Sequence, residues 1–214
     1  MRISKRKLIF GMLLTIGAYP ALAQFGPAGA LLGGGSKSAG PDPIKLESDL
    51  KQIIESTSVA LAKLAEAMGL KETSAKMQKN ADDIKSGAIG LSESANTVSE
   101  TSASVVAEIA KNQKEGKKLD AASSSIAIKA IEPGIKSFPL WVSVVDGIKS
   151  LDPKAISLDR SAMLAIAALV RAGPKVPIAA KNSLDLYQAG ISYLAFSGAD
   201  TSSVKKAAES ALKF

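Results

Sequence analysis

The chain has 214 residues, enough to bury a sizeable core, and it contains neither Cys nor His. These absences exclude a disulfide framework, zinc sites built from nitrogen and sulfur ligands, and the common nucleophile–base pairs of enzymes. Of the 27 Lys and Arg residues, four lie in an N-terminal leader without acids, so 23 stand against 20 Asp and Glu elsewhere, a net charge of +3. That small excess, with an aromatic content of 4%, argues against nucleic-acid binding.

Residues 1–23 have the order of a cleavable signal peptide. A basic segment, Arg2 to Lys7, precedes the apolar run Leu8 to Ala18, and Ala21-Leu22-Ala23 is the small-x-small pattern that signal peptidase accepts. The apolar run is shorter than the about 20 residues that a membrane-spanning helix needs. We therefore predict export, with the mature chain periplasmic or secreted after cleavage following Ala23, and a stable N-terminal anchor as the alternative.

Residues 24–42 are rich in Gly and Pro, which predicts a flexible linker. The alternative is that Phe25 to Leu32 forms a short docking peptide within it. Asp42-Pro43 is a good N-cap followed by a proline suited to the first helical turn. From Leu46 to Met68, apolar residues recur at spacings of three and four, which predicts one helical face. Gly69 supplies the left-handed residue that ends this helix.

The stretch from Lys71 to Gln113 carries apolar or small residues at alternating spacings of four and three, a heptad pattern sustained over more than four repeats. It predicts one long, coiled-coil-like helix, bent near Gly87 and Gly90 because glycine disfavours helix. A partner helix could lie along this seam if the chain's own helices leave it open, and otherwise the seam is core. The candidate partner-binding seam consists of Met77, Ile84, Leu91, Val98 and Val105.

The rest of the chain predicts shorter helices separated by Gly and Pro, and no stretch alternates with the period of a strand. Pro133-Gly134 is expected to end the first of these helices. The predicted fold class is all-α, with a long helical hairpin over 43–132 and a compact bundle of shorter helices over 133–214. The shorter helices are expected at 119–132, 138–150, 153–172, 177–197 and 202–212.

Two apolar segments of the C-terminal half could be core or binding surface. Phe138, Leu140 and Trp141, which include the only Trp, form a candidate docking patch, with a core anchor as the plainer interpretation. Ser161 to Ala180 is almost free of charge, and prolines break it into pieces too short to span a bilayer. It predicts a buried core helix, with an interfacial helical hairpin as the alternative.

No motif in the chain carries recognisable chemistry. Several Ser-x-x-Lys pairs occur, among them Ser48-Lys51 and Ser202-Lys205, but the abundance of Ser and Lys accounts for them and no second catalytic motif accompanies them. We expect no cofactor, no metal and no catalysis. The preferred hypothesis is an exported helical-bundle protein with a structural or adaptor role in a cell-envelope assembly, acting on an unknown protein partner or by self-association. A membrane-active or lipid-binding helical protein is the alternative, ahead of an enzyme.

Overall fold

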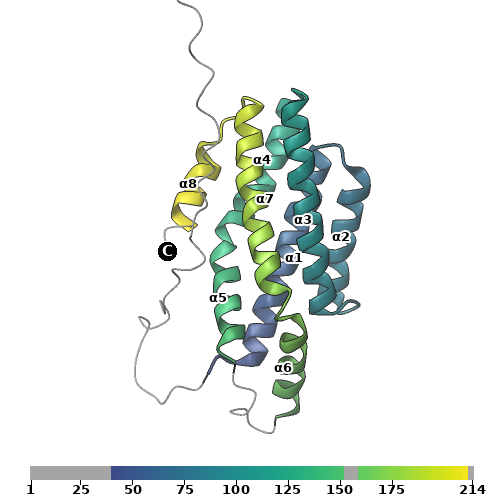
Figure 1. Cartoon of the computed structure of the whole chain (residues 1–214), viewed down its shortest axis with the longest axis vertical. Helices are drawn as coiled ribbons and strands as arrows, with labels where there is room; N and C mark the ends of the chain where they lie inside the picture. The colour runs from purple at the N-terminus through teal and green to yellow at the C-terminus, as the bar shows by residue number, and fades with distance from the viewer. Residues whose placement is uncertain (1–39, 152–158, 212–214) are drawn as a thin grey trace, which may run out of the picture. The chain divides into compact units, whose positions relative to one another are not determined.

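The computed structural model describes residues 40–151 and 159–211, and within these ranges it contains eight α-helices and no strand (Figure 1). This confirms the predicted all-α fold class and its helical-bundle packing. The predicted signal peptide, most of the linker and the predicted helix start at Pro153 lie outside the described residues. The helices are α1 (Pro43–Ala67), α2 (Lys71–Ser86), α3 (Leu91–Lys114), α4 (Ala121–Lys136), α5 (Phe138–Lys149), α6 (Arg160–Ala172), α7 (Val176–Phe196) and α8 (Ser202–Ala211).

Short-range capping signals set the ends of several helices where the sequence predicted them. The Asp42 carboxylate accepts a hydrogen bond from the backbone N–H of Ile44 at 2.9 Å, which satisfies a donor that the helix leaves open. After α1, Gly69 adopts φ +75°, the left-handed conformation in which glycine is not strained. Asp200 likewise accepts from the backbone N–H of Ser202 at 2.9 Å before α8.

The single long helix predicted over 71–113 is wrong, because the chain forms two helices there. Helix α2 ends at Ser86, Gly87 adopts φ +76°, and α3 begins at Leu91 after Gly90. A continuous helix of that length would extend about 64 Å. The reversal instead lets both halves of the apolar seam pack against α1 (Figure 1).

The predicted stop at Pro133-Gly134 is also wrong, since α4 continues through both residues to Lys136. Gly134 lies directly against the ring of Tyr187 on α7, and a Cβ atom there would come within 2.6 Å of the ring. Glycine therefore allows α4 and α7 to approach closely. A tertiary contact of this kind is invisible in the local sequence, which is why Pro-Gly suggested an end.

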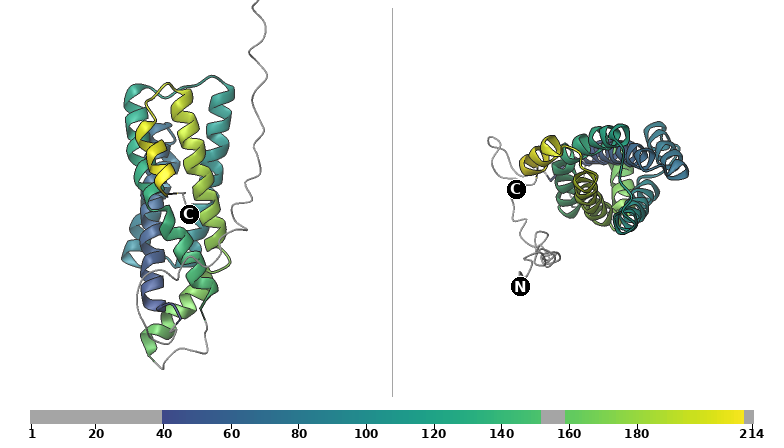
Figure 2. Two further views of the ribbon diagram at one scale, coloured as in Figure 1. Left: turned by 90° about the vertical axis from the view of Figure 1, so that its left-hand side faces the viewer. Right: turned by 90° about the horizontal axis from the view of Figure 1, so that it is seen from above.

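Helices from both sides of position 133 share one core. Helix α3 packs along α7, while α1 contacts α2, α4, α5 and α6 (Figures 1 and 2). These neighbours bury twelve residues of α1, so the first helix is central to the packing. The largest fully buried side chains include Leu50, Ile53, Ile54, Leu61, Leu64, Met77, Ile84, Ile109, Ile131, Trp141, Leu169 and Tyr187.

Candidate interaction surface

The predicted partner-binding seam lies inside the bundle. Met77 and Ile84 project from α2, and Leu91, Val98 and Val105 project from α3; their exposed fractions lie between 0% and 5%. The chain's own helices therefore cover the seam, and in this fold none of its surface is open to a partner helix.

A buried polar network accompanies the seam. Asn80 of α2 donates a hydrogen bond to the Ser58 hydroxyl of α1 at 2.8 Å and accepts one from the Ser94 hydroxyl of α3 at 3.1 Å. Because a misaligned helix would leave these buried groups unpaired, the network favours one relative position of the three helices. Sequence reasoning missed Asn80, although its position four residues before the seam residue Ile84 places it beside the apolar face.

The predicted docking patch is mostly core as well. Trp141 is completely buried and its indole N–H donates to the Thr57 hydroxyl of α1 at 3.2 Å, while Phe138 is 8% exposed and Leu140 is partly buried. Burial raises the pKa of the nearby Tyr187 to about 12, an effect that the Thr57 hydroxyl partly offsets. These aromatic groups anchor α5 and α7 to α1.

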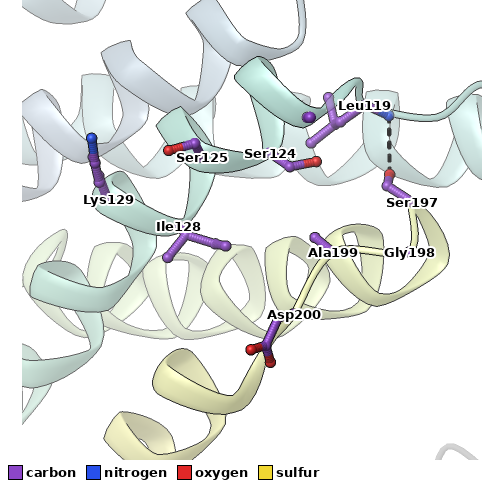
Figure 3. Close-up of a pocket in the computed structure, with 10 residues that line it drawn as sticks. Leu119, Ser124, Ser125, Ile128, Lys129, Ser197, Gly198, Ala199 and Asp200 are labelled. Atoms are coloured by element: carbon purple, nitrogen blue, oxygen red, sulfur yellow. Dashed lines mark hydrogen bonds between the residues drawn. The ribbon is translucent and has the colours of Figure 1, made fainter.

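An open hollow of about 410 Å³ lies between α4 and the turn that joins α7 to α8 (Figure 3). The backbone N–H of Leu119 donates to the Ser197 hydroxyl at 3.0 Å on one side of it. Lys129 and Asp200 are the charged residues of its lining. The Ser202 hydroxyl donates a hydrogen bond to the Asp200 carboxylate at 2.6 Å, and the Ser202 backbone N–H donates a second one. These bonds, the hydroxyl's first, hold the pKa of Asp200 below its usual range.

The polar groups of the hollow come from both of its sides. Asp200 accepts two hydrogen bonds from Ser202 at the start of α8, and Lys129 lies in the same lining as Ser124, Ser125 and Ser197. In the Ser-x-x-Lys pair Ser48-Lys51, Lys51 instead forms an ion pair with Glu47 at 3.1 Å. Among residues 40–151 and 159–211, no group of three acidic side chains lies close enough to hold a metal ion.

Helix α6 is unusual because it is apolar on both faces. Its inner face, Ala162, Ala165, Leu169 and Ala172, is buried against α1 and α3. Its outer face consists of Met163, Leu164, Ala167 and Val170, hereafter the α6 face. Met163 is 52% exposed, Leu164 64% and Val170 56%. A helix that is apolar all round is normally covered on every side, whereas none of residues 40–151 and 159–211 covers the α6 face.

After the N-cap residue Asp159, the charged residues of α6 and of the turn that follows it are all basic. No acidic residue occurs between Asp159 and Asp185, a stretch that contains Arg160, Arg171, Lys175 and Lys181. Lys181 forms an ion pair with Asp185 at 2.5 Å. The other three basic side chains are exposed, and none of them pairs with an acidic side chain in the described part of the chain.

Within the described ranges, no single helix has the length and apolar character required to cross a membrane. Helices α6 and α7 meet those requirements only when taken together, and they are bent by 60° at their junction. Within the segment Ser161–Ala180, which was predicted to be a buried core helix, α6 has a buried inner side and an exposed apolar outer side; the interfacial alternative stays a prediction.

Comparisons of the chain with protein-family models, with curated proteins and with solved structures found no match.

Proposed function

We propose that this chain is an exported, non-enzymatic helical-bundle protein that acts by binding another component of the cell envelope, in a structural or adaptor role. The observation that supports this proposal is the α6 face, which carries three of the five exposed large apolar side chains in the described part of the chain; the other two are Ile44 and Ile178. Single exposed apolar side chains are common on proteins, but several on one helical face mark an interaction surface.

The exposed side chains of the α6 face can supply part of the free energy of a contact. Met163, Leu164 and Val170 each expose slightly more than half of their surface. Covering the exposed part of one such side chain stabilises a contact by about 1 kcal/mol, so the three together contribute about 3 kcal/mol before the entropic cost of binding. Such a contribution fits a reversible contact that neighbouring charges strengthen.

We assign binding to the α6 face, and not to the predicted seam, because the seam is buried and the α6 face is exposed. A partner at Val98 or Ile84 would have to displace α1 or α7 from the core, whereas a partner at Leu164 meets an exposed side chain without any rearrangement.

The test is sedimentation of the purified chain from Gln24 to Phe214 with isolated cell envelopes of the organism that encodes it. The double variant Leu164→Ser with Val170→Ser should bind up to roughly 30-fold more weakly, because it removes most of the apolar contact area of two side chains. Ala103→Ser with Ala107→Ser, two exposed positions on α3, is the matched control and should bind like the unmodified chain. Equal binding by both double variants, or no sedimentation of the unmodified chain, would contradict the proposed function.

A further inference from the structure

We propose that the α6 face binds the anionic surface of a phospholipid bilayer, with α6 lying in the plane of the interface. This inference rests on the binding function proposed above and names its partner.

The first argument is the pattern of charge. Arg160 lies at the beginning of α6, Arg171 at its end and Lys175 in the turn that follows, so basic side chains flank the apolar face at both ends. No acidic residue lies between them. Apolar residues flanked by Lys and Arg are typical of helices that rest in the headgroup region of anionic membranes.

The second argument concerns the alternative of a second copy of the chain. In a symmetric dimer the same surface meets itself, so Arg160, Arg171 and Lys175 of one copy would approach the same residues of the other. Asp159, the N-cap of α6, is the acidic residue next to these three cations, and no other acidic residue occurs before Asp185 to compensate that repulsion. Charge complementarity therefore favours a negatively charged partner over self-association.

The third argument is the size and attachment of α6. Its 13 residues extend about 20 Å, which is too short to span a hydrocarbon core of about 30 Å but suited to lying along its surface. The inner face is held on α1 and α3 through Leu169 and small side chains. The outer face of α6 can thus enter the interface while the bundle stays folded.

The test is flotation of the chain from Gln24 to Phe214 with vesicles of phosphatidylcholine alone and of an equimolar mixture of phosphatidylcholine and phosphatidylglycerol. This form keeps every described residue and omits the apolar leader, which would itself enter a bilayer. We expect binding to the anionic vesicles, release as salt shortens the Debye length from about 10 Å at 0.1 M to about 3 Å at 1 M, and little binding to the neutral vesicles.

Matched charge variants locate the interaction. Arg171→Gln with Lys175→Gln should weaken binding to the anionic vesicles by roughly 30-fold, the factor expected for two cations near an anionic surface. Lys76→Gln with Lys114→Gln removes the same charge from exposed positions on α2 and α3 and should have a small effect. Similar losses in both double variants would show a response to net charge alone and would overturn the proposal.

A fluorescent probe on a single introduced Cys tests whether α6 lies in the interface. Because the chain has no Cys, Leu164→Cys and, as a control, Ala103→Cys each accept a single environment-sensitive fluorophore. Anionic vesicles should shift the emission of the probe at position 164 to shorter wavelengths and leave that at position 103 unchanged. Emission of the buried Trp141 reports whether each variant is folded.

The outcomes separate the two proposals. If the α6 face is required for sedimentation with cell envelopes but the chain ignores anionic vesicles, the bilayer is overturned as partner and an envelope protein with an acidic surface takes its place. Equal binding to neutral and anionic vesicles also overturns the inference, since charge would then have no role. If sedimentation with cell envelopes does not depend on Leu164 and Val170, both the proposed function and the inference of a bilayer partner fail.

Discussion

Truncating Ile84 and Leu164 separately, each to Ala, compares the two apolar surfaces that this sequence contains. Ile84 of α2 is 1% exposed within the seam, and Leu164 of α6 is 64% exposed. Removing a buried Ile side chain leaves a cavity and lowers the free energy of unfolding by about 2–5 kcal/mol. Removing an exposed Leu side chain changes it by less than about 0.5 kcal/mol.

Thermal unfolding measures this difference as a difference between the Tm values of the two variants. For a domain of this size, each kcal/mol shifts Tm by roughly 2–4 °C, so Ile84→Ala should lower Tm by roughly 4–20 °C and Leu164→Ala by no more than about 2 °C. Helical circular dichroism follows the transition, and emission of the single, fully buried Trp141 follows the core independently. Coincident curves from the two probes would justify a two-state treatment.

Two results would refute the reasoning. If Ile84→Ala leaves Tm unchanged, α2 does not bury the seam, and the seam returns as a candidate binding surface. If Leu164→Ala lowers Tm as much as Ile84→Ala does, another part of the chain covers the α6 face, and that face is no longer available to a membrane or any other partner.

Three further predictions concern the core. Gly134→Ala should lower the free energy of unfolding by about 1–2 kcal/mol in urea titrations despite Ala's better helix propensity, because its Cβ meets the ring of Tyr187; the loss should disappear in a Tyr187→Ala background. Burial raises the pKa of Tyr187 to about 12, so its contribution to stability is complete below pH 10 and is lost as the pH rises through about 12. Alkaline titrations of stability should therefore fall less steeply in Tyr187→Phe, and identical slopes would contradict the prediction. Asn80→Ala should lower the free energy of unfolding by about 1–3 kcal/mol, since it leaves the buried Ser94 hydroxyl without its acceptor, and a neutral result would refute the network.

Local chemistry determined much of the secondary structure. The Asp42-Pro43 start and the left-handed Gly69 involve groups within a few residues of one another, so their effect can be predicted from the sequence. The same holds for which residues share a helical face, because periodicity alone defines it. All five seam residues indeed lie on apolar faces of α2 and α3.

The candidate site could not be predicted to the same extent. Periodicity says which side chains point the same way and is silent on what covers them, so the seam was open to two interpretations. Gly87 was expected to bend a helix, and only the packing of both α2 and α3 on α1 shows that the chain reverses there. Pro133-Gly134 failed as a stop because Tyr187, which is distant in the sequence, requires glycine at that position.

Helix α6 shows most clearly which properties follow from the sequence and which depend on the tertiary structure. Its sequence is apolar on every side, and composition alone therefore suggested a buried helix with an interfacial alternative. The tertiary structure decided which side faces inward: Ala162, Ala165 and Ala172 allow close approach to α1 and α3, whereas the bulkier Met163 and Leu164 remain outside. Small side chains at three inner positions let α6 approach α1 and α3 closely, and Leu169 fills the remaining space of the contact.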